Sequence, residues 1–424
     1  MKRPQASCEH RYYKRVTRAR TTRCWGVVVA IGLVLPAGAR TFADQWPNVP
    51  APFPTPAATP PPAVTPAPKP AAPVTYESAW TVPFSGDGPL SLTITPWNLI
   101  LSGNQIATEA RAMDDGRVLW TSPRQADTAP VVAGDVVIVP SGSQLVALDA
   151  ATGHDVWFAD FTGAAQPPVV AGDTVLVASG TTLTVRKSAD GLPLWAVNMG
   201  ATAIAPPAAG DALIVVALDD RTLAAFERST GQPRWREPLD VRVLAVAVLG
   251  DRAYVSAAEG YACAHKLEHG RRDWCFHVRV RPIGAAVGDA RQVYFAFLDN
   301  MVHVFDRRSG RRYYTPFLDA LPAAGAVLTN DYLIVPVVTG EFVLLALRDQ
   351  LTTSRVSTPR AAELPSTRAA AVAVDGSALA IVTTSAGGRY SLVYFRRQEP
   401  APAPTPAETS EAKPETKEEP NMKP

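Results

Sequence analysis

The stretch Leu145–Trp157, LVALDAATGHDVW, sets a pattern that the chain repeats several times. Asp149 stands four residues before Gly153, and Trp157 stands four residues after it. An aspartate side chain can accept hydrogen bonds from the backbone of a turn, and a glycine can adopt the positive φ that closes it. Because apolar residues precede and follow the turn, the stretch predicts a β-hairpin.

The spacing Gly-x-x-x-Trp recurs along the chain at steps of 37 to 40 residues. A sixth copy keeps the glycine, Gly310, but has Tyr314 in place of the tryptophan. The five complete copies are Gly116 with Trp120, Gly153 with Trp157, Gly191 with Trp195, Gly231 with Trp235, and Gly270 with Trp274. A repeat of this length predicts an architecture built from similar units rather than a single irregular core.

A second series of turn signals, in phase with the first, brings the number of units to eight. Gly134-Asp135 precedes the apolar run VVIVP, and similar pairs recur as far as Asp375-Gly376. Several short strands in each unit of about 40 residues are typical of a β-propeller. We therefore predict an all-β, eight-bladed propeller of four-stranded antiparallel blades, with seven blades as the alternative.

The two ends of the repeat region complement each other. Tyr76–Phe84, YESAWTVPF, resembles a fourth strand around Trp80 but has no preceding strands, whereas the last unit ends without a fourth strand. An open ring would leave unpaired backbone groups at its edge. We therefore predict that this N-terminal strand completes the last blade.

The flanking segments have compositions unlike that of the repeats. Residues 1–43 place basic residues before a short apolar run and an A-x-A site, which is typical of a signal peptide, with a membrane anchor as the alternative. Residues 44–75 are a Pro/Ala-rich linker, residues 76–398 the propeller, and residues 399–424 a Pro/Glu/Lys-rich tail expected to be disordered. We expect an exported protein of the periplasm or cell envelope, either free or held at a membrane through its N-terminal segment.

The repeat ALDAATGxxxW resembles the pyrroloquinoline-quinone-type propeller repeat, in which the tryptophan packs between neighbouring blades. The resemblance covers about 320 residues and leaves two kinds of protein open. Quinoprotein dehydrogenases carry the quinone and Ca²⁺ with an Asp base, commonly beside a vicinal cysteine pair, which this chain lacks. The other kind is the non-catalytic exported propeller, similar to the BamB-type outer-membrane assembly factor, although no lipid-attachment cysteine follows the apolar run.

This resemblance favours a non-catalytic scaffold that binds an envelope protein, such as an outer-membrane assembly component. No catalytic residue, cofactor or metal is expected, and a nucleic-acid partner is not expected for an exported protein. A quinone-dependent enzyme or its degenerate relative, and a ligand-binding sensor, are the alternatives. Long links at Thr315–Ala324 and Gln350–Ser366 are further places where binding residues can lie.

Two sets of side chains in copies five and six are candidates for special roles. Cys263 and Cys275 fall opposite each other in one hairpin, so a disulfide is feasible, with two buried thiols as the alternative. His265 and His277 lie on opposite sides of this pair along the strands, too far apart to share one tetrahedral ion. The candidate basic patch for a partner protein or anionic lipid consists of Arg271, Arg272, Arg307, Arg308, Arg311 and Arg312, with ordinary solvated turn charge as the alternative.

Overall fold

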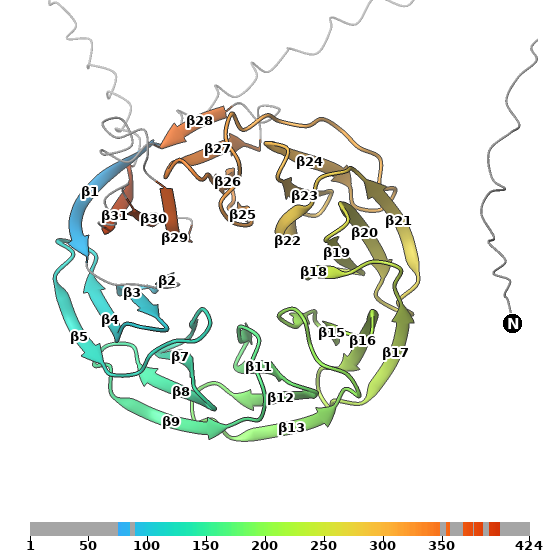
Figure 1. Cartoon of the computed structure of the whole chain (residues 1–424), viewed down its shortest axis with the longest axis horizontal. Coiled ribbons are helices and arrows are strands. Elements are labelled where there is room, and N and C mark those ends of the chain that lie inside the picture. The colour runs from blue at the N-terminus through green and yellow to red at the C-terminus, as the bar shows by residue number, and fades with distance from the viewer. Residues whose placement is uncertain are drawn as a thin grey trace, which may run out of the picture. The chain divides into compact units, whose positions relative to one another are not determined.

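The computed structural model describes residues 75–84, 90–347, 353–356, 368–375, 377–384 and 390–398. Their strands form eight antiparallel sheets arranged as blades around a ring (Figure 1). The prediction of an eight-bladed propeller is therefore confirmed. The expected signal segment, nearly all of the linker and the acidic tail lie outside the described residues.

In each blade the strands run from the ring centre outward in chain order, except that β1 is the outermost strand of blade eight. The strands of the first four blades are β2 (Leu90–Ile94), β3 (Asn98–Gly103), β4 (Thr108–Ala112), β5 (Val118–Ser122); β6 (Val131–Ala133), β7 (Val136–Ser141), β8 (Gln144–Asp149), β9 (Asp155–Asp160); β10 (Val169–Ala171), β11 (Thr174–Ser179), β12 (Thr182–Lys187), β13 (Pro193–Asn198); β14 (Ala208–Ala209), β15 (Leu213–Ala217), β16 (Thr222–Glu227) and β17 (Pro233–Pro238).

The strands of the last four blades are β18 (Val243–Leu249), β19 (Arg252–Ala257), β20 (Tyr261–Lys266), β21 (Arg272–His277); β22 (Pro282–Gly288), β23 (Gln292–Phe297), β24 (Met301–Asp306); β25 (Val327–Leu328), β26 (Tyr332–Pro336), β27 (Phe342–Ala346), β28 (Thr353–Val356); β29 (Arg368–Val374), β30 (Ala378–Thr384), β31 (Tyr390–Gln398) and β1 (Thr75–Phe84). The described residues contain no helix of the length and hydropathy that crossing a membrane would require.

The ring closes as predicted, because β1 pairs antiparallel with β31 from Thr75↔Gln398 to Phe84↔Tyr390. Trp80 of β1 stacks on Tyr394 of β31, with ring centroids 5.3 Å apart. The N-terminal strand thus supplies the backbone partner and the apolar cover that the last blade lacks.

The hydrophobic core lies between neighbouring blades. The second and third strands are buried on both faces: every residue of β3 and β11 is buried, and one cluster joins Ile100 of blade one to Val137 and Val146 of blade two. Such strands read as nearly continuous apolar runs because each face of a blade packs on its neighbour. Stability is therefore distributed around the ring as a series of similar interfaces.

Six tryptophans of the outer strands interlock successive blades. Each indole ring lies over the turn glycine of the next blade, and each Nε1–H donates to the carbonyl three residues before that glycine, at 2.7 to 3.1 Å. The pairs are Trp80 with Gly116, Trp120 with Gly153, Trp157 with Gly191, Trp195 with Gly231, Trp235 with Gly270, and Trp274 with Gly310.

Blade six departs from the pattern at its outermost position. Among the described residues its sheet contains three strands, and the following chain meets β24 only through the isolated bridges Phe305↔Arg312 and Met301↔Phe317. Tyr314 stands here in place of the tryptophan, and the next hairpin, β27 to β28, contains no glycine for such a ring to cover. The loss of the motif therefore coincides with the loss of the regular outer strand.

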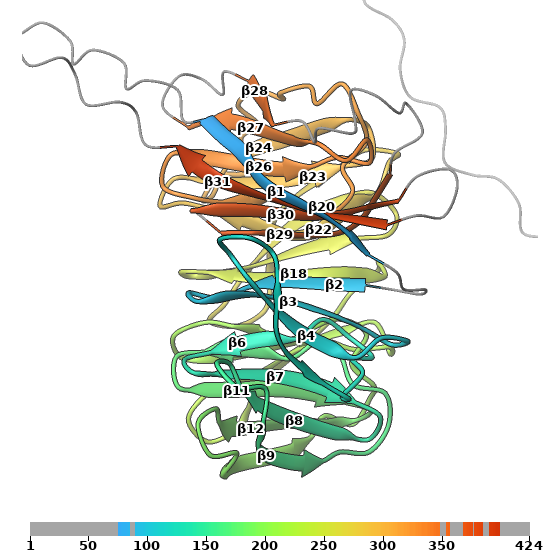
Figure 2. The same cartoon turned by 90° about the vertical axis from the view of Figure 1, so that its left-hand side faces the viewer.

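The two faces of the ring carry different turns. The turn between first and second strands lies beside the turn between third and fourth strands, as shown by hydrogen bonds from Ala150 N–H to Asp135 O and from Ser188 N–H to Asp173 O, at 2.8 and 2.9 Å. We call this side the turn face, and the side with the second-to-third turns and the links between blades the link face. Figure 2 shows the blades edge-on, with the start of β1 and the end of β31 together on one side.

Candidate functional site

Five of the six predicted arginines form an exposed group on the turn face. Arg271 and Arg272 follow the blade-five turn, while Arg308, Arg311 and Arg312 belong to the blade-six turn. We call these five residues the basic surface. The two turns are neighbours, because Trp274 of β21 covers Gly310, and the Arg312 guanidinium lies 5.5 Å from the ring centre of Phe276 on β21.

Arg307 differs from the other five, because its side chain is used within the fold. Its Nη1 donates to the carbonyl of Asp289 and its Nη2 to the carbonyl of Leu249, both at 2.6 Å. Arg228 of blade four makes similar bonds two blades earlier in the ring, donating to the carbonyls of Ala171 and Gly210. Arg307 is thus a clamp between blades five and six, a role that sequence reasoning missed although both arginines stand three residues before a motif glycine.

The two turns of the basic surface also hold two acidic residues, the exposed Glu268 in blade five and Asp306 in blade six. Asp306 is occupied locally: it accepts from the backbone N–H of Ser309, the Ser309 hydroxyl and the Tyr313 hydroxyl, at 2.8, 2.8 and 3.1 Å. These hydrogen bonds, the Ser309 backbone one foremost, lower the pKa of Asp306 to about 2. Among the residues that the structure covers, none of the five guanidinium groups is in an ion pair. Their charges face solvent.

Cys263 and Cys275 are register partners on β20 and β21, with Cα atoms 4.1 Å apart, and the structure joins their sulfur atoms. Cys263 is 3% exposed, whereas Cys275 lies open on the outer strand. The pair faces a recess of about 470 Å³ between blades four and five. We propose that this disulfide forms when the protein is in an oxidising compartment.

The two histidines beside this pair do not act together. His265 is buried, with Nδ1 2.8 Å from the Gly270 carbonyl, and burial lowers its pKa. His277 stacks on Tyr261 and its Nε2 lies 3.1 Å from the Glu259 carbonyl. No three His, Cys, Asp or Glu side chains of the described ranges are arranged to hold a metal ion.

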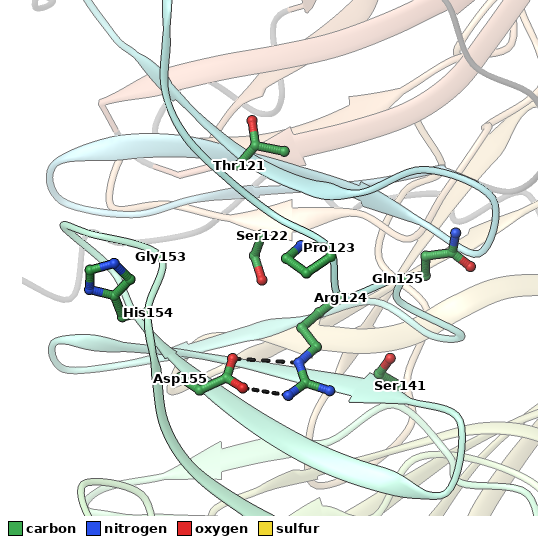
Figure 3. A pocket seen from close by; sticks show the side chains of 9 residues that line it. All are labelled: Thr121, Ser122, Pro123, Arg124, Gln125, Ser141, Gly153, His154 and Asp155. Carbon is green, nitrogen blue, oxygen red and sulfur yellow. Dashed lines mark hydrogen bonds and ion pairs between the residues drawn. The ribbon is translucent and has the colours of Figure 1, made fainter.

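A recess of about 480 Å³ between the outer strands of blades one and two contains His154 and Asp155 (Figure 3). Arg124, which follows β5, forms an ion pair with Asp155 across the recess. No hydrogen bond joins His154 to Ser122 or Ser141 in this recess, all of whose residues are described. The arrangement is a link between blades, not a nucleophile with its base.

An apolar surface that the sequence analysis did not identify covers the outer strands of blades one to three. It consists of Leu119, Val156, Phe158 and Leu194, and we call it the apolar rim; Phe158 is 64% exposed and the others 42 to 48%. The signal was present in the sequence: these residues flank the motif tryptophans. The corresponding positions of β17 and β21 hold Arg234, Arg236, Asp273 and Cys275.

The edges of these outer strands are protected only in part: each carries one bulge, at Leu119 in β5, Val156 in β9 and Leu194 in β13. Natural edge strands commonly carry lysine, proline or a bulge that discourages the pairing of another strand. β5 and β9 contain no proline and no basic residue, whereas β17 begins and ends with proline and has two arginines between. Exposed apolar side chains beside an open strand edge favour binding of an extended segment of another protein.

The repeat, the interlocking tryptophans and the closed ring define an eight-bladed propeller of the pyrroloquinoline-quinone-like class. A family model described as "Outer membrane protein assembly factor BamB" matches residues 106–205 and 181–392. The chain belongs to this family. No curated protein sequence matches it.

Three solved structures share the fold at low sequence identity. BamB from Moraxella catarrhalis is 17% identical with a TM-score of 0.58, covering 76% of this chain and 100% of that one. The computationally designed Ika8 protein is 12% identical with a TM-score of 0.60, covering 72% and 96%. Quinohemoprotein alcohol dehydrogenase ADHIIG from Pseudomonas putida HK5 is 12% identical with a TM-score of 0.56, covering 78% of each chain.

Proposed function

We propose that the protein is a non-catalytic scaffold of the cell envelope that binds another protein, in the manner of an outer-membrane assembly factor. Membership of the BamB family supports a scaffold role in protein–protein interaction. The observation that carries the proposal is the apolar rim, four exposed apolar side chains on three consecutive outer strands. Export to the periplasm, through the N-terminal segment, is part of the same proposal.

The rigidity of the ring suits this role. Each interlocking tryptophan makes one hydrogen bond and one ring contact to the next blade, so the outer strands keep fixed relative positions. A partner that pairs with the edge of β9 and covers Phe158 would meet a surface formed in advance, which reduces the entropy lost on binding. The basic surface is a second proposed contact on the turn face.

Quinone-dependent catalysis fits the described residues poorly. Calcium prefers six to eight oxygen ligands, and no cluster of acidic or other metal-binding side chains occurs in the described ranges. Five of the eight innermost strands, β6, β10, β14, β18 and β25, consist only of valine, alanine and leucine. We therefore derive no catalytic step through a quinone.

The test is crosslinking in intact envelopes followed by affinity purification of the full-length protein and mass spectrometry. A Phe158→Asp variant places a charge at the centre of the apolar rim. Leu321→Asp is the matched control, because Leu321 is 42% exposed but lies in the link between blades six and seven. Loss of outer-membrane assembly components from Phe158→Asp alone supports the proposal, and equal recovery from both variants contradicts it.

A further inference from the structure

We propose that residues 399–424 of this chain bind the basic surface of their own propeller, so that a partner at that surface must displace them. The segment holds six glutamates and three lysines, a net charge of −3. It contains no aromatic residue and no valine, leucine or isoleucine, so any contact it makes must come chiefly from charge and hydrogen bonding. The basic surface offers five exposed guanidinium groups for that purpose.

The segment begins on the correct face of the ring. Arg396 of β31 pairs with Ala378, the first residue of β30 after the turn that starts at Asp375, and Arg397 N–H donates to Ser377 O at 3.0 Å. In the other blades too, the end of the third strand pairs with the start of the second strand, and this end lies on the turn face. The chain therefore leaves Gln398 on the same face as the basic surface.

Distance along the ring also favours the contact. The segment leaves blade eight, and only blade seven separates it from the basic turn of blade six. Twenty-six residues span at most about 90 Å when extended. Blade six thus lies among the parts of the turn face that the segment meets first.

The charge distribution of the turn face selects blades five and six. The blade-six turn Asp306–Arg312 holds four arginines and one aspartate, and all but Arg307 of those arginines face solvent. In contrast, the turns of blades two and three present Asp135, Asp149, Asp173 and Asp190 beside one exposed lysine, Lys187. A glutamate-rich segment is repelled from the second region and attracted to the first.

Because residues 399–424 are attached to the propeller, weak ion pairs are sufficient to hold them at the basic surface. A single exposed ion pair contributes about 0 to 1 kcal/mol and is screened by salt. A segment tethered to the same protein is present at a local concentration on the order of millimolar. Several weak pairs can therefore keep the basic surface occupied in the free protein, while an acidic partner with better geometry can still replace the segment.

The test uses the full chain with a photo-crosslinking amino acid, p-benzoylphenylalanine, in place of Thr409. After irradiation at low salt, we expect crosslinks concentrated in the peptides that contain residues 266–272 and 306–314. The yield should fall at least about fivefold in Arg308→Glu/Arg311→Glu and when salt is raised to about 0.5 M, where the screening length falls below about 5 Å. Crosslinks spread over all blades, or a yield unaffected by either change, would overturn the proposal.

A matched control varies two arginines of the same blades on the opposite face. Arg279→Glu/Arg281→Glu alters exposed residues in the link from β21 to β22 and should leave the crosslink yield within about 1.5-fold of the parent protein.

A second measurement compares the full chain with a variant lacking residues 399–424 for binding to phosphatidylglycerol vesicles and to a labelled polyglutamate peptide. Tighter peptide binding after removal supports self-occupation. Equal binding of peptide or vesicles by both proteins assigns the surface to an external partner and contradicts self-occupation, whatever the outcome at the apolar rim.

Discussion

The indole of Trp120 covers Gly153 so closely that a Cβ added to this glycine would lie 2.5 Å from Cε3 of the ring. The same tryptophan donates from Nε1 to the Ala150 carbonyl at 3.0 Å. The spacing of the repeat thus has two requirements, a glycine with positive φ and a tryptophan in the preceding blade. Each copy of the motif supplies the glycine for one interface and the tryptophan for the next.

Gly153→Ala should lower the free energy of unfolding by about 2 to 4 kcal/mol, because the methyl group meets the indole and the residue has a φ of 74°. Gly134→Ala is the control, since Gly134 has a φ of 59° and a Cβ there would have nothing within 4 Å. It should cost about 1 kcal/mol, the backbone part alone. Chemical denaturation compares the two, and equal losses would contradict the importance of the ring contact.

Trp80→Ala should destabilise the protein by about 3 kcal/mol, because it removes a large side chain from the interface that closes the ring. Trp97→Ala serves as the control: Trp97 is 53% exposed, and its replacement should change stability by less than about 0.5 kcal/mol. Thermal and denaturant unfolding measure both variants. Similar values for the two tryptophans would show that closure by β1 contributes little.

Arg307 and Arg308 are adjacent in sequence but should behave differently on substitution. Arg307→Ala leaves the carbonyls of Leu249 in blade five and Asp289 in blade six without their donor and should cost about 2 to 3 kcal/mol. Arg308→Ala should change the free energy of unfolding by less than about 0.5 kcal/mol. If the order of the two losses were reversed, Arg307 would belong to the basic surface after all.

Most of the architecture was predictable because a similar unit recurs along the chain, and the turn signals of each copy mark where one blade ends and the next begins. The period, the turn signals and the incomplete ends together predict eight blades and closure by Tyr76–Phe84. The role of Arg307 was not predictable in this way, because its sequence neighbours are solvent-facing arginines and only the carbonyls of other turns reveal its direction. The apolar rim was missed because apolar residues on both sides of a tryptophan are equally typical of a strand whose two faces are both buried.

The disulfide can be tested with two single variants in a background where Cys8 and Cys24 are changed to serine. Cys263→Ser leaves Cys275 on the exposed outer strand, so a thiol reagent should label it in the native protein. Cys275→Ser leaves Cys263, which is 3% exposed and should be labelled only after unfolding. Either variant should cost at most about 3 kcal/mol, the limit for so short a loop. Free thiols on both cysteines of the parent protein under oxidising conditions would exclude the bond.

Asp306→Asn tests the turn of blade six through the pH dependence of stability. The pKa of Asp306 is lowered from 3.8 to about 2 by hydrogen bonds from Ser309 and Tyr313, so the folded state favours the carboxylate. Its contribution is complete above pH about 4 and is lost as the pH falls through about 2. The variant should therefore unfold about 1 kcal/mol more easily than the parent at pH 7, and the difference should shrink toward zero as the pH falls through about 2.

Glu268→Gln in the blade-five turn is the control for this experiment. Glu268 is exposed, and no hydrogen bond to its side chain occurs within the described residues, so its variant should track the parent protein across the same pH range. Denaturant unfolding at several pH values between 2 and 7 gives both difference curves. A difference for Asp306→Asn that stayed constant with pH would mean that the amide's altered geometry, and not the lost charge, destabilises the turn.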